Sequence, residues 1–196
     1  MAMKKLFFET EQDGFYGTYY ENPNGADCAV IGLFGDDPND YMAKCGAKWL
    51  HKNGVNALCM SPGKHNYSHV NCPLEKIETA IQWLMAHGNR KVGIIGKLIL
   101  IGADDGSLWE AGKYVRRMDQ RLQKYPHECD YEAVTYSHGT HFVLPESMPR
   151  MALPIGLKFV MRFLFRSAKQ YPDACEAARN DIDKRLSAAL QEWIAV

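Results

Sequence analysis

Two short polar motifs contain the residues that could carry acid–base chemistry. Gly102-Ala103-Asp104-Asp105 follows an apolar stretch and precedes an expected helix. His138-Gly139-Thr140-His141 follows the next expected strand, which ends at Tyr136. Open α/β sheets place their functional residues at the carboxyl ends of parallel strands. Because a carboxylate can orient an imidazole and stabilise its charged form, the two motifs predict the acid and the base of one site.

Each motif also has a structural interpretation. Acidic residues before a helix interact favourably with the positive end of its dipole, which alone would explain Asp104 and Asp105. A histidine at a strand end is commonly a hydrogen-bonding loop residue. The order of the motifs favours chemistry, because an acid after one strand and a histidine one βα unit later is the order found in α/β-hydrolases.

The elements expected around these motifs alternate along the chain. Strands are expected at 28–34, 55–60, 91–95, 98–101 and 131–136. Helices are expected from Asp37-Pro38 to Asn53-Gly54, from Pro73 to Gly88, from a capping box of Ser107 and Glu110 to about Tyr125, and over about 153–170 and 173–194. This alternation predicts an α/β protein with a mostly parallel sheet and helices on both faces.

Two features modify this pattern. Asp13-Gly14 predicts the tight turn of an N-terminal β-hairpin over residues 4–21. Residues 91–102, KVGIIGKLILIG, contain two parallel-type strands joined directly at Gly96-Lys97. Parallel neighbours need a crossover of about a dozen residues, so this run is either one long strand or lacks an internal element. We therefore expect a single, shortened domain over 1–196, with a first βα half at 27–96 and a second half at 97–196.

Four segments carry a family resemblance: GLFGDDPND, CMSPG, LILIGADDGSLWEAGKY and YSHGTHFVLPES. Over about residues 10–150 the chain resembles the α/β-hydrolase domain of the acyl-CoA thioester hydrolase / bile acid-CoA:amino acid N-acyltransferase (BAAT) family. The resemblance implies a three-layer α/β-hydrolase-type fold. It also implies hydrolysis or transfer of an acyl group from an ester or thioester, such as an acyl-CoA.

The resemblance also assigns roles to individual residues. It places the acid at Asp105 and the histidine base at His141, with Asp104 and His138 as the less favoured member of each pair. The loop at Gly35 and Asp36 matches the position of the family's oxyanion-hole amide.

The nucleophile that the resemblance implies is missing. The family has a Ser or Cys on a sharp elbow after the strand that matches KVGIIG, but here Gly96 continues directly into Lys97 and no GxSxG or GxCxG occurs. Cys59 and Ser61 end a neighbouring expected strand and could substitute, although a buried Cys59 that packs as a small apolar residue is the favoured interpretation. The alternative function is therefore a catalytically inactive homologue that binds or oligomerises through exposed strand edges.

The composition and the N-terminal sequence argue against several other classes of protein. The 196 residues include 23 basic and 23 acidic ones, so the chain has no net positive charge that would favour binding to nucleic acid. The longest apolar run, Val92–Ala103, is about half a membrane span, and no signal-peptide core forms before Glu9 and Glu11. Six cysteines without a CxxC pair predict reduced thiols in a cytoplasmic protein.

Two further patterns leave alternatives open. His65 and His69, and likewise His138 and His141, have spacings that metal sites use, but no cysteine pair completes a zinc set, so neither a metal nor a cofactor is expected. The aromatic and basic stretch at 159–169 could be a basic amphipathic surface helix, and a helix packed on the sheet is the favoured interpretation.

Overall fold

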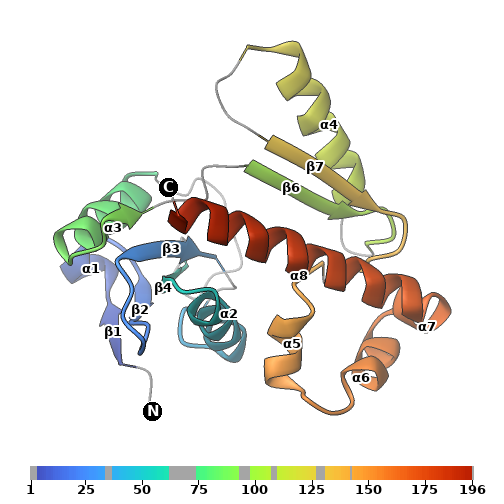
Figure 1. The fold of residues 1–196 in the computed structure, drawn as a ribbon, viewed down its shortest axis with the longest axis horizontal. Coiled ribbons are helices and arrows are strands. Elements are labelled where there is room, and N and C mark those ends of the chain that lie inside the picture. Colours follow the sequence, from blue (N-terminus) through green and yellow to red (C-terminus); the bar gives the residue numbers. More distant parts are fainter. Residues whose placement is uncertain are drawn as a thin grey trace. The chain divides into compact units, whose positions relative to one another are not determined.

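The chain divides into two compact units, Met1–Ile94 and Ile95–Val196 (Figure 1). The structure is a computed structural model that describes residues 4–33, 37–61, 74–92, 98–106, 110–126, 131–141 and 143–195. The junction at Gly96/Lys97 lies outside the described residues, so its proposed internal gap stays a prediction, as does the single domain.

The first unit is built on a five-stranded mixed sheet in the order β1-β2-β4-β3-β5. Its elements are β1 (Lys5–Phe8), α1 (Thr10–Asp13), β2 (Gly17–Tyr20), β3 (Cys28–Gly32), α2 (Tyr41–Lys52), β4 (Asn56–Met60), α3 (Glu75–Ala86) and β5 (Lys91–Val92). Strand β3 pairs in parallel with β4 and β5, whereas β2 is antiparallel to both β1 and β4. The predicted α/β class is confirmed.

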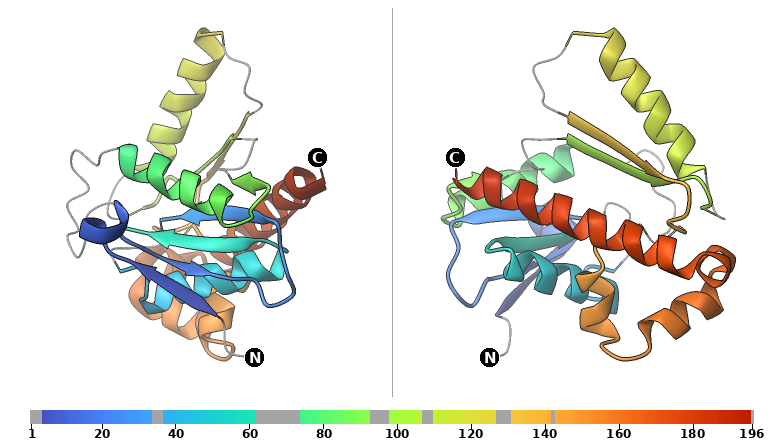
Figure 2. Two further views of the ribbon diagram at one scale, coloured as in Figure 1. Left: turned by 90° about the vertical axis from the view of Figure 1, so that its left-hand side faces the viewer. Right: turned by 45° about the vertical axis from the view of Figure 1, so that its right-hand side comes forward.

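Helices α2 and α3 cover opposite faces of this sheet (Figure 2). Leu58 and Met60 of β4 belong to one apolar cluster with Ala80 and Leu84 of α3. The intervening Cys59 points the other way, and its thiol donates to the Ala43 carbonyl of α2 over 3.5 Å. Side chains alternate between the faces of a strand, so β4 is buried on both sides, as its largely apolar sequence predicts.

The N-terminal strands β1 and β2 are joined by a helical turn, so the expected tight turn at Asp13-Gly14 is wrong. Residues Thr10–Asp13 form α1, and Asp13 Oδ2 accepts the Glu9 N–H over 2.8 Å. Gly14 has a φ of +80° and ends the helix, with its N–H donating to the Thr10 carbonyl. The glycine serves as a helix C-cap, which uses the same left-handed backbone as a tight turn.

Helix α2 begins three residues later than Asp37-Pro38 predicts. The Asp40 side chain accepts the Ala43 N–H over 2.7 Å and caps the helix, whereas Asp37 accepts from Asn39 in the preceding turn. Both aspartates are suitable caps, and local sequence does not choose between them. The predicted stop at Asn53-Gly54 is confirmed, since Gly54 has a φ of +86°. The expected helix starts at Pro73 and Ser107 lie outside the described residues.

The second unit begins with a parallel strand–helix–strand unit. Its elements are β6 (Leu98–Ala103), α4 (Ala111–Lys124), β7 (Tyr131–Tyr136), α5 (Ser147–Ala152), α6 (Leu157–Leu164), α7 (Arg166–Gln170) and α8 (Pro172–Ala195). Helix α4 crosses over between β6 and β7, and it approaches β6 closely at Gly102. A Cβ atom at Gly102 would lie 2.7 Å from the Ala111 carbonyl carbon, so only glycine fits there.

The helix expected over 153–170 is divided. Gly156, with a φ of +88°, precedes α6, and Phe165 has an extended backbone between α6 and α7. Several polar contacts join helix α8 to the rest of the unit. Tyr136 of β7 donates to Asp181 over 2.7 Å, and Arg179 contacts Glu146 over 2.6 Å with both side chains buried.

Candidate acid–base site

The two polar motifs lie side by side at the carboxyl ends of β6 and β7. The strands are parallel and pair Ala103 with Tyr136, so the residues that follow each strand leave the sheet at the same edge. The Asp104 N–H donates to the Tyr136 carbonyl over 2.9 Å and extends this pairing by one residue. The proximity that the sequence predicts is therefore present.

The Asp105 carboxylate anchors the loop that carries both histidines. Its Oδ1 atom accepts the N–H groups of Gly139 and Thr140 over 3.0 and 2.9 Å. Its Oδ2 atom lies 3.4 Å from Nδ1 of His138, and the Ser167 side chain of α7 also hydrogen-bonds to the carboxylate. One carboxylate thus connects the end of β6, the loop after β7 and a helix some 60 residues further along the chain.

These contacts keep Asp105 ionised. Burial raises the pKa of this carboxyl group, but the hydrogen bonds from Ser167, Gly139 and Thr140 outweigh burial and hold the pKa below its usual value. A charged acceptor strengthens each of these hydrogen bonds.

The histidine loop has an unusual backbone at Thr140. This buried residue has a φ of +64°, the left-handed region that a β-branched side chain rarely adopts. Next to it, a Cβ atom at Gly139 would lie 2.9 Å from the Ala103 Cβ atom. Backbone strain of this kind persists only where the surroundings hold it, and it is concentrated at functional sites.

The two histidines have different surroundings. His138 faces the Asp105 carboxylate, and its ring stacks on Tyr171 with centroids 3.7 Å apart and planes 11° from parallel. His141 lines a pocket of about 330 Å³ with Asp105, Thr140, Leu164, Phe165, Arg166, Ser167 and Gln170. Both therefore lie beside the acid, with His138 at ion-pair distance and His141 in the wall of the pocket. The choice of His141 as the base stays a prediction.

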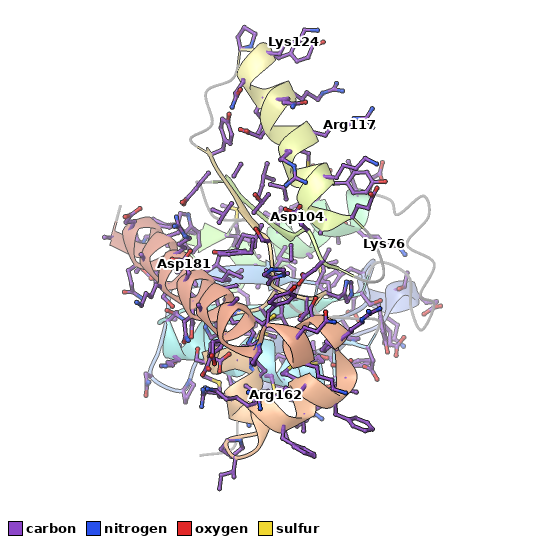
Figure 3. All side chains as sticks on the ribbon, turned by 90° about the vertical axis from the view of Figure 1, so that its right-hand side faces the viewer. Lys76, Asp104, Arg117, Lys124, Arg162 and Asp181 are labelled. Atoms are coloured by element: carbon purple, nitrogen blue, oxygen red, sulfur yellow. The ribbon has the colours of Figure 1, made fainter. Side chains whose placement is uncertain are left out.

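Asp104 has a different role from Asp105. Its Oδ1 atom lies 2.7 Å from an Arg116 nitrogen on α4, and both side chains are largely exposed (Figure 3 labels Asp104). Asp104 thus fits the helix-stabilising interpretation of the acidic pair, whereas Asp105 faces the histidine loop.

Sequence reasoning missed Ser167 and Tyr171. Both lie far along the chain from the motifs, and they reach the site because the chain breaks at Phe165 and begins α7. No local spacing signals such a contact. Gly35 and Asp36, the predicted oxyanion residues, lie outside the described residues, as do His65 and His69.

Cys59 is not activated as a nucleophile. It is buried in β4, and burial raises the pKa of its thiol to about 12. A nucleophilic cysteine needs a lowered pKa, whereas Cys59 is buried, as its interpretation as a small apolar residue expects. Ser61 is likewise buried. The other described cysteines, Cys28, Cys45 and Cys175, are also buried and free.

The described residues hold no group of three or more His, Cys, Asp or Glu side chains suited to a metal ion. Among the described residues, too, no helix has both the length and the hydropathy of a membrane span.

In comparisons with known proteins, no protein-family model matches the chain and no curated protein matches it.

Proposed function

We propose that the chain is an α/β-hydrolase-type protein of the acyl-CoA thioester hydrolase/BAAT kind. Its second unit would supply the acid and base for hydrolysis or transfer of an acyl group from an ester or thioester. One observation carries the proposal: the Asp105 carboxylate binds the backbone of a strained loop that holds two histidines, at the carboxyl ends of two parallel strands.

In this proposal His141 is the general base and Asp105 its orienting carboxylate. The imidazole removes a proton from the attacking hydroxyl, thiol or water and returns one to the leaving thiolate or alkoxide. Because its pKa is lowered, Asp105 is charged at neutral pH and can stabilise the imidazolium that forms between these two transfers. The side chains of Leu164 and Phe165 give the pocket an apolar wall for part of the acyl group.

A second candidate is a catalytically inactive homologue that binds a small ester or thioester or forms homo-oligomers. Two observations favour it: the sequence has no GxSxG or GxCxG motif, and the Cys59 thiol is buried with a raised pKa. Asp105 would then only stabilise the loop. For both candidates a cytoplasmic location stays a prediction.

A combined labelling and turnover experiment separates the two. The protein is treated with a fluorophosphonate probe, and release of CoA from acyl-CoAs of increasing chain length is followed. An enzyme should release CoA, and His141→Ala should reduce the rate by about 10²-fold or more. His87→Ala, which changes a histidine of the first unit, is the matched control. A protein with native circular dichroism that neither reacts with the probe nor releases CoA would overturn the enzymatic proposal and support the inactive one.

A further inference from the structure

Helix α6 buries only one narrow face. Leu157 and Met161 pack against Ala168 and Cys175, with Phe165 beside them. The remaining large apolar side chains point to solvent: Phe159 is 75% exposed, Phe163 83% and Leu164 60%. The favoured sequence interpretation, a helix packed on the sheet, does not hold for these residues.

Basic side chains accompany the exposed aromatic ones. Arg162, Arg166 and Lys169 are all exposed, and none of them forms an ion pair with a described acidic residue. Lys158 on the same helix differs, since it contacts Glu176 over 2.5 Å. We call Phe159, Arg162, Phe163, Leu164, Arg166 and Lys169 the α6–α7 surface; Figure 3 labels its Arg162.

All the charged residues in the segment that carries this surface are basic. Residues 153–171 contain four basic residues and no acidic one, in a chain whose formal net charge is zero. A shallow hollow of about 840 Å³ lies between the aromatic and basic side chains and is bordered by Phe159, Arg162, Phe163, Lys169, Gln170 and Pro172. A partner for this surface must therefore offer both apolar contact and negative charge.

We propose that the α6–α7 surface binds the surface of an anionic lipid bilayer. Exposed aromatic residues flanked by Lys and Arg are the features of helices that lie in the membrane interface. The phenyl rings would enter the headgroup region while Arg162, Arg166 and Lys169 contact lipid phosphates. Helix α6 has eight residues and is about 12 Å long, which suits lying on a bilayer and not crossing it. This inference does not rest on the proposed catalysis, although Leu164 and Arg166 also line the pocket beside Asp105.

Vesicle sedimentation tests the proposal with the full chain. The protein should sediment with phosphatidylcholine vesicles that contain phosphatidylserine, and sediment less with phosphatidylcholine alone. Raising the ionic strength should weaken the binding, because salt screens the attraction to anionic headgroups. Equal sedimentation with both kinds of vesicle, or with neither, would overturn the proposal.

Paired variants locate the surface. Arg162→Gln with Arg166→Gln should lower the partition coefficient by about 25-fold, at about fivefold for each charge. Phe159→Ser with Phe163→Ser should abolish measurable binding while circular dichroism stays native. The matched controls change residues outside this surface: Arg117→Gln on α4, and Leu74→Ser at a leucine that is 74% exposed. Both variants should bind vesicles as the unchanged protein does.

Other partners give distinguishable results. A second copy of the chain would show as a dimer in light scattering without lipid, lost in the Phe159→Ser/Phe163→Ser variant. If that dimer forms and vesicles do not sediment the protein, the surface is a protein interface and the bilayer proposal is wrong.

Discussion

The Asp105 side chain holds together three pieces of backbone that are distant in sequence. Its Oδ1 atom satisfies two loop N–H groups, and Ser167 adds a third hydrogen bond. Hydrogen bonds to a charged group contribute about 1.5–3 kcal/mol each, and a buried donor left without its acceptor costs a similar amount. The conformation of the histidine loop therefore depends on this one carboxylate.

Asp105→Asn should lower the free energy of unfolding at pH 7 by about 1–3 kcal/mol, because an amide is a weaker acceptor than a carboxylate. Urea unfolding followed by circular dichroism measures the change. Asp104→Asn, which alters the exposed contact with Arg116, is the matched control and should have a smaller effect.

The effect of Asp105→Asn should depend on pH in one direction. The pKa of Asp105 is lowered in the folded protein, so its ionisation stabilises the fold above the unfolded pKa of about 3.9. That contribution falls away as the pH drops through the lower folded pKa. The difference between the variant and the unchanged protein should therefore shrink below about pH 4. A difference that stays constant down to pH 2 would contradict this role.

At the scale of elements, helix α8 depends on a buried ion pair. Arg179 lies on α8 and Glu146 directly precedes α5, and each side chain is less than 5% exposed. The Glu146 N–H also donates to the Arg179 carbonyl, so backbone and side chains join the same two segments. A buried charge without its partner is costly, so neither residue is replaceable alone.

Arg179→Ala should destabilise the second unit by about 3–5 kcal/mol, because it leaves the Glu146 carboxylate buried beside one remaining cation. Thermal and urea unfolding measure the loss. Arg150→Ala removes the other, more exposed arginine on Glu146 and is the matched control, with a clearly smaller loss expected. Similar losses for the two variants would show that burial of the pair does not matter.

Most strands and the longer helices could be predicted because the strands of the first unit are largely apolar and these helices have an apolar period, but the short helices α1 and α5 were not expected. The predictions were wrong where the local sequence fits two conformations equally well. Asp37 and Asp40 can both cap a helix, and Gly14 can end a helix or form a turn. The break at Phe165 has no strong local signal, since neither Gly nor Pro lies between Leu157 and Tyr171.

The position of the candidate site could be predicted, but not the contacts of each side chain within it. The Asp105 and histidine motifs follow neighbouring parallel strands, which places them together. Which histidine faces the carboxylate depends on the left-handed backbone of Thr140, and sequence does not predict that conformation at a β-branched residue. Contacts from Ser167 and Tyr171 depend on helix packing far along the chain.

At the scale of the whole molecule, charge balance affects solubility. The 23 basic and 23 acidic residues cancel, and the isoelectric point is about 7.0. Proteins associate most readily where their net charge vanishes. The exposed aromatic residues of α6 strengthen this tendency.

We expect the solubility of the chain to be lowest near pH 7 and to increase toward both pH 6 and pH 9. Precipitation by polyethylene glycol across this range measures it. Phe159→Ser with Phe163→Ser should raise solubility at pH 7 without moving the minimum, because these changes leave the charge unaltered. A minimum displaced by more than about one pH unit would contradict the charge explanation.

The buried thiols allow the local unfolding of each unit to be measured separately. Cys28, Cys45 and Cys59 belong to the first unit and Cys175 to the second, and all four are buried and free. An alkylating reagent can reach such a thiol only when the structure around it opens transiently. The modification rate of each cysteine, resolved by mass spectrometry of its peptide, therefore follows the local unfolding of one unit at a time in an unaltered chain.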